Sequence, residues 1–299
     1  MDREHFIIRV YCLVCELCQA HRDKYTLRRG GFAPALTDEE VITIELCGEY
    51  FKLATDKDIF DYFRAHGHHF FPALTERSLF VRQAANLWQV KAFMHQQLIQ
   101  CSGQADGTVQ IIDTLPLPVC TYTRTKRERC FKPFVAFGHC VAKKMDYYGF
   151  KLGLRVSRCG MIVQFPLLPA RPHEVNFLGD LLEGFGGGTA PADKGFIDAF
   201  RQALLQERQA VLVVTLRRKG MAPSPHPGSV LRCCTRLRKR VETVGSHLVE
   251  RFAVARLRAH DLWHYSHRLI RKVLSHTVAV FLNLRLGREP LDLDGLVTA

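Results

Sequence analysis

The pattern of hydrophobic and polar positions changes once along the chain, near residue 105. Before that point, apolar residues recur at helical spacing and few runs alternate as strands do. Two helix starts carry capping-box patterns, Thr37 with Glu40 and Thr55 with Asp58. The pattern therefore predicts helices that begin at about residues 38 and 56.

A longer helix is expected after Pro72, over residues 74–100. Three helices with an arginine- and histidine-bearing final element are typical of a helix-turn-helix-like DNA-binding module. An all-helical packing or dimerisation unit would give the same pattern. We expect a helical domain over residues 1–103, with both interpretations open, and a second domain over residues 104–299.

Beyond residue 105 the apolar runs are short and turn residues separate them. The first run ends in Asp113 and is interrupted by Pro116 and Pro118, and a later one ends just before Asp193. A hairpin is expected from residues 147–157 and 161–169. Helices are expected over residues 174–184 and 196–208, and a further strand over residues 210–215. This order is similar to that of the ribonuclease H-like fold, so the predicted class is α/β (α+β), a mixed sheet with flanking helices.

The stretch RLRKRVETVGSHLVERF, residues 236–252, carries two glutamates on a predicted long helix. At 100° per residue its apolar positions form one stripe, made of Leu237, Val241, Val244, Leu248, Phe252 and Ala255. Glu242 lies at the border of that stripe, about 120° from its centre, whereas Glu250 lies about 160° away, where a solvated charge is expected. Glu242 is therefore the glutamate predicted to reach the sheet edge; a plain pair with Arg238 at i,i+4 is the other interpretation.

Three carboxylates, those of Asp113, Asp193 and Glu242, would repel one another at one place unless a cation joined them. Oxygen-only ligation suits Mg²⁺ or Mn²⁺. Two such ions can activate the attacking oxygen and stabilise the leaving oxygen of a phosphoryl transfer. The pattern predicts a two-metal phosphoryl-transfer site.

The charge of the chain points to a polyanionic partner. There are 42 Lys+Arg against 29 Asp+Glu, a net +13, which favours nucleic acid, although a basic surface kept for solubility would look the same. Between aromatic residues, the segment 121–134 carries Lys126, Arg127 and Lys132. This loop suits contact with DNA phosphates, with a solvated charged loop as the alternative.

The chain has 11 cysteines, but its N-terminus does not resemble a signal peptide. No run reaches the roughly 18 uncharged apolar residues of a membrane span. We therefore expect a cytoplasmic protein with reduced thiols. Cys12, Cys15 and Cys18 could share a metal ion, but no second pair has the usual spacing, so cysteines along one side of a helix are the favoured interpretation.

Several blocks resemble, in the same order, the DDE transposases of bacterial insertion sequences, and specifically the insertion-sequence family numbered 982. They extend over nearly the whole chain and include LTDEEVITIELCGEYF, FVRQAANLWQVK, IIDTLPLPVC, AKKMDYYGFKLGL, ADKGF, RVETVGSHLVERF and VARLRAHDLWHYSHRLIRKVLSHTVAVFLN. The resemblance implies that Asp113, Asp193 and Glu242 are the catalytic triad and ligands of two Mg²⁺ (or Mn²⁺) ions.

The resemblance also implies DNA-binding residues. Arg238 matches the arginine of a wider signature, Tyr-x2-Arg-x3-Glu-x6-Lys, in which Thr235 and Val249 here replace the tyrosine and the lysine. By helical register rather than by the resemblance, Arg256 falls within about 20° of Val249 on a continuous helix. Contact with phosphate in place of the missing lysine and a solvated arginine are the two open interpretations. Lys194, which follows the second aspartate, is expected to reach another phosphate.

The implied function is that of a transposase, which binds the double-stranded inverted repeats at the ends of its insertion sequence. Water attacks a phosphodiester there, and the freed 3′-hydroxyl attacks target DNA. The implied partners are element-end and target DNA and a second copy of the chain in a synaptic complex, in the cytoplasm and on the nucleoid when bound. A ribonuclease H-like nuclease or resolvase without strand transfer, and a catalytically silent DNA-binding regulator, are the alternatives.

Overall fold

The computed structural model of the protein describes residues 1–24, 30, 33–140, 144–216, 220–221 and 223–298. The chain divides into two compact units: Met1–Leu98 together with His247–Ala299, and Ile99–Ser246. The predicted division at residue 103 lies five residues after the observed one, and the larger difference is at the C-terminal end. Residues from His247 onward pack with the N-terminal helices.

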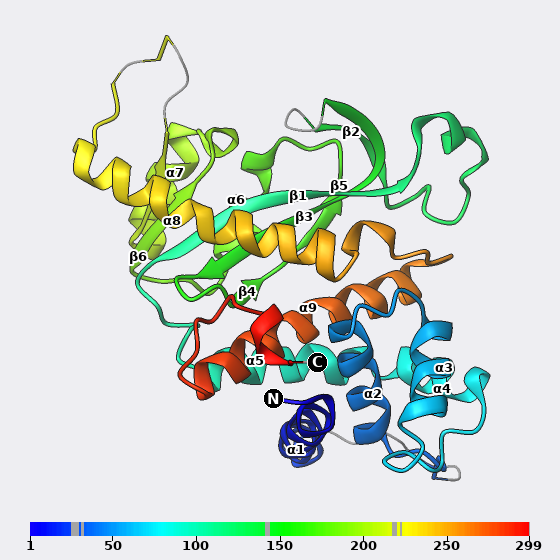
Figure 1. Cartoon of the computed structure of the whole chain (residues 1–299). Helices are drawn as coiled ribbons and strands as arrows, with labels where there is room; N and C mark the ends of the chain where they lie inside the picture. Colours follow the sequence, from blue (N-terminus) through cyan, green and yellow to red (C-terminus); the bar gives the residue numbers. More distant parts are fainter. Residues whose placement is uncertain (25–29, 31–32, 141–143, 217–219, 222, 299) are drawn as a thin grey trace. The chain divides into compact units, whose positions relative to one another are not determined.

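The first unit is built from helices (Figure 1). They are α1 (Arg3–Arg22), α2 (Asp38–Tyr50), α3 (Asp56–His66), α4 (Arg77–Asn86), α5 (Trp88–Cys101) and α9 (Leu262–Arg285), with a π-helical turn at His247–Arg251 and 3-10 turns at Val254–Arg256 and Asp294–Leu296. The last three residues of α5 lie in the second unit.

The predicted helix starts are confirmed. Thr37 and Glu40 exchange both bonds of a capping box at α2, and the Thr55 side chain accepts from the amide of Asp58 at α3. The single long helix expected over residues 74–100 is wrong, because Leu87 leaves helical geometry (φ −89°, ψ 12°) and separates α4 from α5. Leu87 is 1% exposed, so packing of this residue overrides its local helix propensity.

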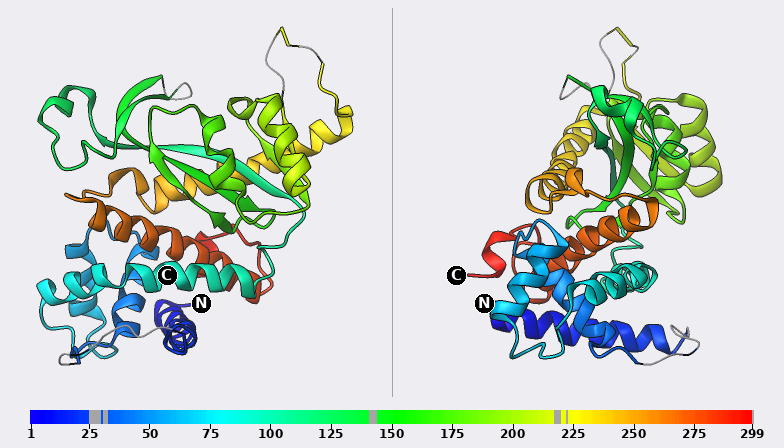
Figure 2. Two further views of the ribbon diagram at one scale, coloured as in Figure 1. Left: turned by 180° about the vertical axis from the view of Figure 1, so that it is seen from behind. Right: turned by 90° about the vertical axis from the view of Figure 1, so that its right-hand side faces the viewer.

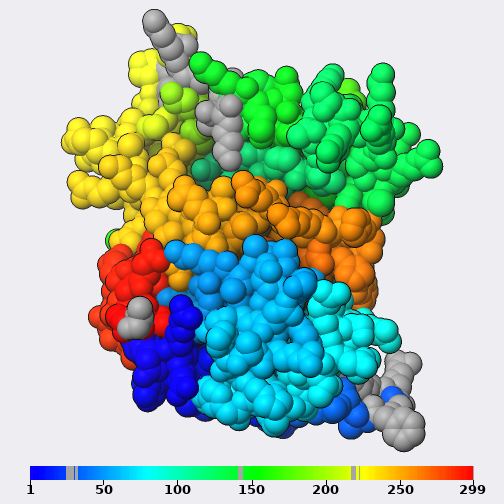
Figure 3. All heavy atoms as spheres, turned by 45° about the vertical axis from the view of Figure 1, so that its right-hand side comes forward, coloured from blue at the N-terminus to red at the C-terminus, as the bar shows by residue number. Residues whose placement is uncertain are grey.

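Helices α2 and α9 form the interior of the first unit. Every residue of α2 from Val41 to Tyr50 is buried. Gly48 allows α3 to come close, since a Cβ at this position would lie 2.7 Å from Cγ1 of Ile59. The two ends of the chain also meet here: the Met1 amino group donates to the Leu296 carbonyl oxygen at 3.1 Å, and the dark blue and red surfaces adjoin (Figure 3).

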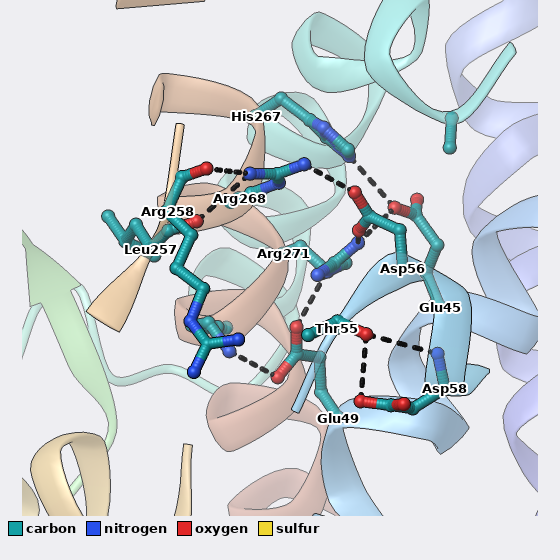
Figure 4. A network of polar contacts seen from close by, with 12 residues as sticks. Glu45, Glu49, Thr55, Asp56, Asp58, Leu257, Arg258, His267, Arg268 and Arg271 are labelled. Carbon is teal, nitrogen blue, oxygen red and sulfur yellow. Dashed lines mark hydrogen bonds and ion pairs between the residues drawn. The ribbon is translucent and has the colours of Figure 1, made fainter. Parts of the chain in front are cut away.

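A network of buried charges joins α9 to α2 (Figure 4). The Arg271 guanidinium donates to Glu49 Oε1 at 2.7 Å, to Glu45 Oε1 at 3.0 Å and to Asp56 Oδ1 at 2.7 Å. Lys272 Nζ donates to Glu49 Oε2 at 2.6 Å. Burial alone would lower the pKa of Arg271, but these carboxylates outweigh it and raise that pKa. The charges are therefore buried as a mutually compensated group.

The second unit has a mixed α/β architecture, as the sequence predicts. Its elements are β1 (Gln110–Cys120), β2 (Ala136–Cys140), β3 (Met145–Ser157), β4 (Ile162–Gln164), β5 (Leu167–Pro169), α6 (Leu178–Leu182), β6 (Gly188–Ala192), α7 (Ala199–Gln209), β7 (Val211–Thr215) and α8 (Gly228–Ser246), with 3-10 turns at Tyr122–Arg127, Glu174–Phe177 and Lys194–Phe196.

Strand β3 is central to the antiparallel part of the sheet, where it pairs with β1, β2, β4 and β5. The predicted hairpin is confirmed by the pairing of β3 with β4 and β5. Strands β6 and β7 are parallel, and a parallel bridge from Val109 to Thr189 places β6 beside the start of β1. The ends of β1 and β6 thus lie in the same part of the unit.

Helices cover both faces of this sheet: α8 crosses one face, and α6 and α7 cover the other (Figure 2). Ile112 belongs to the core that includes α6 and α7. Because side chains alternate along a strand, Ile111 and Asp113 project to the opposite face, where α8 lies. The predicted apolar stripe of α8 is confirmed by buried Val241 and Val244.

The prediction that this helix continues to Ala255 is wrong. Helix α8 ends at Ser246, five π-helical residues follow, and Ala253 adopts a left-handed conformation at φ 49°. A π turn and a left-handed residue both break the 100° register. The expected alignment of Arg256 with Val249 therefore does not hold.

Candidate active site

The three predicted carboxylates line one cleft of the second unit, with a volume of about 780 Å³. Asp113 comes from β1, Asp193 directly follows β6, and Glu242 lies on α8. The alternation of β1 explains the placement of Asp113, and the helical register explains that of Glu242. Glu250, the alternative glutamate, is exposed, as predicted, but Glu242 is exposed as well, so exposure does not separate the two.

Arg238 lies between two of these carboxylates. Its guanidinium contacts Asp193 Oδ1 at 3.2 Å and Glu242 Oε1 at 3.8 Å, and its side chain is 14% exposed. Among the residues that the structure describes, no three His, Cys, Asp or Glu side chains converge closely enough to hold one ion. Arg238 therefore provides the positive charge that keeps Asp193 and Glu242 together in this arrangement.

Asp113 is the most buried of the three carboxylates. Burial raises its pKa to about 6, with smaller contributions from Asp193 and Glu174, although the Thr114 amide and Arg238 act in the opposite direction. The Thr114 amide donates to Asp113 Oδ1 at 2.8 Å and fixes the carboxyl group. A set of oxygen donors, one of them costly to ionise, fits a hard divalent cation.

Replacement of Asp113 by asparagine is expected to stabilise the metal-free protein above pH 6. The raised pKa means that the folded state binds the proton more tightly than the unfolded state, so wild-type stability falls as pH rises from 3.8 to about 6. The difference corresponds to at most about 3 kcal/mol. Thermal unfolding at pH 4 and pH 7.5 measures it: the gain should appear at pH 7.5 only, and an equal gain at both would contradict the assignment.

Several residues outside the predicted set of catalytic and DNA-binding residues also line this cleft. They are Thr114, Leu115, Pro116, His139, Cys140, Tyr147, Lys151, His173, Glu174 and Gly195. Glu174 Oε1 accepts from the Thr114 hydroxyl at 2.7 Å and so holds the residue next to Asp113. His173 instead caps the following 3-10 turn, since its ring accepts from the Val175 amide. In the sequence, the adjacent polar residues His173 and Glu174 are the feature that points to this part of the site.

Gly195 lies directly against the carboxyl end of the Glu174 side chain. A Cβ at this position would lie 1.7 Å from Glu174 Oε2. We expect Gly195→Ala to cost about 1–3 kcal/mol of stability, as overpacking does. Gly245→Ala is the matched control, because a Cβ there meets nothing within 4 Å and should add about 0.5–1 kcal/mol to the helix. Melting temperatures that shift in the same direction in the two variants would contradict this close contact.

The other predicted DNA-binding residues lie in different places. Lys194 lines the cleft beside Asp193. Lys126 and Arg127 belong to the 3-10 turn Tyr122–Arg127 and, with Lys132, are exposed, but none of the three lines the cleft. Arg256 belongs to the first unit, where it lines a separate cleft.

The eleven cysteines are all free. Cys12, Cys15 and Cys18 lie on α1 with exposed, half-buried and buried side chains, respectively. They do not form a metal cluster within the part of the chain that the structure describes.

Comparison with known proteins gives one family match. Residues 102–261 match the family model described as "Transposase DDE domain", which covers more than half of the 299-residue chain. No curated protein matches the chain. Of the described helices, none is long and apolar enough to cross a membrane.

Proposed function

We propose the function from one premise: the chain belongs to the family of proteins with a transposase DDE domain. As a DDE transposase, the protein would bind the terminal inverted repeats of its insertion sequence, cut DNA there, and transfer the freed strand to target DNA. The observation that carries the proposal is the cleft into which β1, the end of β6 and α8 bring Asp113, Asp193 and Glu242.

The sheet order supports a ribonuclease H-like core for this unit. Strand β1 lies between antiparallel β3 and the start of parallel β6, and β7 continues the parallel part. The sequence blocks support membership of the insertion-sequence family numbered 982. We further propose that the helices within residues 1–103 belong to a DNA-binding domain.

In the proposed active site, Asp113, Asp193 and Glu242 would hold Mg²⁺ or Mn²⁺, two ions in all. The chemistry that such cations supply is activation of an attacking oxygen and neutralisation of charge on the leaving oxygen of a phosphodiester. The chain contributes the orientation: the Thr114 amide fixes Asp113, and Glu174 holds the Thr114 hydroxyl.

Basic residues near these carboxylates would position the DNA. Arg238, which already lies within 4 Å of Asp193 and Glu242, is placed to bind a phosphate in the cleft, and Lys194 lines the same cleft. The exposed Lys126, Arg127 and Lys132 would contact the DNA backbone farther along. Such contacts position DNA and carry no sequence information by themselves.

Two element ends must be held together before strand transfer. We therefore expect two copies of the chain to act in one synaptic complex, each with one set of carboxylates. The protein would act where its DNA substrate lies, on the nucleoid.

The decisive experiment uses DNA that flanks the gene. A duplex that ends in the flanking inverted repeat is incubated with the purified protein, Mg²⁺ and a supercoiled target plasmid. The expected products are a nick at the repeat end and repeat DNA joined to the plasmid. Nicks without joined products would indicate a nuclease or resolvase, and DNA binding without nicks would indicate a silent regulator; either result would overturn the proposal.

A further inference from the structure

A second cleft, of about 900 Å³, lies within the first unit. Its wall comes from the start of α3, one side of α4, the segment before α9 and the first turns of α9. The described residues that line it are Ala54, Thr55, Asp56, Lys57, Arg77, Ser78, Val81, Arg82, Ala85, Asn86, Arg256, Leu257, Arg258, Trp263, His264, Arg268, Arg271 and Lys272. The triad of the second unit contributes nothing to it.

The charge of this cleft is strongly positive. Eight of the lining residues are Lys or Arg, and one, Asp56, is acidic. Burial would raise the pKa of Asp56, but the guanidinium groups of Arg271 and Arg268 outweigh it and lower that pKa to about 2. The charge of Asp56 is thus already compensated from within, and the cleft as a whole favours an anionic ligand.

Four arginines at this cleft are not used by the network. The side chains of Arg77, Arg82, Arg256 and Arg258 make no hydrogen bond or ion pair with the residues that the structure describes, and all four are exposed. By contrast, Lys57, Arg268, Arg271 and Lys272 each bind a carboxylate. The four arginines therefore have guanidinium donors available for a ligand, and phosphate is a ligand that such groups bind in bidentate fashion.

The segment that carries two of these arginines is held in a strained conformation. Arg258 has φ 52°, in the left-handed region that an arginine rarely adopts. Arg268 keeps it there, since its guanidinium donates to the carbonyl oxygens of Leu257 at 3.0 Å and of Arg258 at 2.8 Å (Figure 4). Arg268 is in turn bound by Asp56. The buried network thus fixes the backbone from which Arg256 and Arg258 project.

The same cleft contains an exposed aromatic ring. Trp263 is 47% exposed, and its ring meets that of Trp88 edge to face, with centroids 5.6 Å apart and planes at 82°. Leu257, Val81 and Ala85 add apolar surface to the cleft wall. An aromatic plane beside phosphate-binding groups is the combination by which proteins hold a nucleic-acid strand, with a base stacked on the ring.

We propose that this cleft binds a DNA strand: Arg77, Arg82, Arg256 and Arg258 contact its phosphates, and Trp263 stacks on an unpaired base. This rests on the proposed function, because a transposase supplies DNA as the anion. In this proposal Arg256 contacts a phosphate because it lines the cleft, and not because it aligns with Val249 on one helix. Free nucleotides carry the same phosphate and base chemistry, but a mononucleotide has a single phosphate group, whereas a strand offers a phosphate to each of the four arginines.

The two tryptophans make the cleft directly observable. The chain contains 2 Trp, and both lie at this contact. In a Trp88→Phe variant, the emission of Trp263 alone reports on stacking. Titration with a 20-nucleotide single strand should quench it, whereas the matching duplex should bind without quenching and deoxyadenosine monophosphate at the same concentration should leave it unchanged. Absence of quenching by the strand, or equal quenching by the mononucleotide, would overturn the proposal.

The arginines are tested by salt dependence in the Trp88→Phe background. We expect Arg82→Gln/Arg258→Gln to weaken strand binding at least about tenfold in 100 mM KCl and to reduce the slope of log K against log[KCl] by about 1.4, or about 0.7 for each lost phosphate contact. Arg9→Gln/Arg64→Gln is the matched control, because both arginines are exposed residues of the same unit outside the cleft. Equal affinity and slope in the two double variants would overturn the proposal.

The test of this cleft can fail or succeed independently of the test of the proposed function. DNA cleavage is measured on the same protein preparation with Mg²⁺ and is a property of the carboxylate cleft. Quenching with arginine dependence but no cleavage would sustain the DNA-strand site and contradict the transposase proposal. Cleavage with no quenching would do the reverse. The four arginines are exposed and make no hydrogen bond or ion pair with other described residues, so their substitution should not change the melting temperature. An unchanged melting temperature then shows that each variant is folded.

Discussion

Replacement of Asp113, Asp193 or Glu242 by the matching amide is expected to lower the rate of DNA cleavage by about 10³-fold or more. Each change keeps the shape of the side chain and removes one anionic oxygen ligand. Loss of several kcal/mol of transition-state stabilisation corresponds to a factor of this size. Single-turnover cleavage of element-end DNA in Mg²⁺ measures the effect for each variant.

Glu250→Gln is the control for these substitutions. Glu250 is exposed and lies outside the carboxylate cleft, so its amide variant should cleave at the wild-type rate. Asp113→Asn is informative in another way, because it should lose activity while its stability at pH 7.5 increases. Cleavage that survives in Glu242→Gln would exclude this glutamate from the active site and return the choice to another carboxylate.

Replacement of Arg271 by methionine is expected to destabilise the first unit by about 3–5 kcal/mol, the usual cost of breaking a buried ion pair. Arg271 is 2% exposed and compensates Glu45, Glu49 and Asp56 together. Methionine replaces the apolar stem of the side chain but removes the guanidinium group, so three carboxylates are left near one another with less positive charge. Chemical denaturation at pH 7 measures the loss.

The pH dependence of this loss identifies its cause. In wild type, the low pKa of Asp56 means that its contribution is present above pH 3.8 and is lost as pH falls toward 2. Removal of Arg271 should raise that pKa, so the loss in Arg271→Met should be greater at pH 7 than at pH 4. Arg285→Met on the same helix is the control: this arginine is exposed, its contact is the Phe281 ring at 4.9 Å, and its loss should be below about 1 kcal/mol. Equal losses in the two variants would show that the buried charges do not hold α9 to α2.

Features that depend on neighbouring residues were predictable from the sequence. The helix starts at Thr37 and Thr55 follow from side chains three residues away, and both caps are present. The position of Glu242 beside the apolar stripe required only the helical register of α8. Strand alternation, with Ile112 on one face, is enough to direct Asp113 to the face that α8 crosses.

Features that depend on distant packing were not predictable. The interruption at Leu87 has no glycine or proline near it in the sequence. Gly245 stands before the π turn that follows Ser246, but a glycine alone does not specify a π turn. Glu49 and Arg271 are 222 residues apart and would each be read as solvated charges, yet they are buried because they meet. The contact of Arg238 with Asp193 likewise arises between elements, whereas its i,i+4 contact with Glu242 could be anticipated.

The most direct test of the central claim is to map where a divalent ion binds. Fe²⁺ can replace Mg²⁺ at a carboxylate site, and with ascorbate and oxygen it cuts the backbone beside the bound ion. Mass spectrometry of the fragments should show cuts near residues 113, 193 and 242 together, suppressed by excess Mg²⁺ and absent in Asp113→Asn. Cuts confined to other parts of the chain, or a pattern unchanged in Asp113→Asn, would contradict a metal site formed by these three carboxylates.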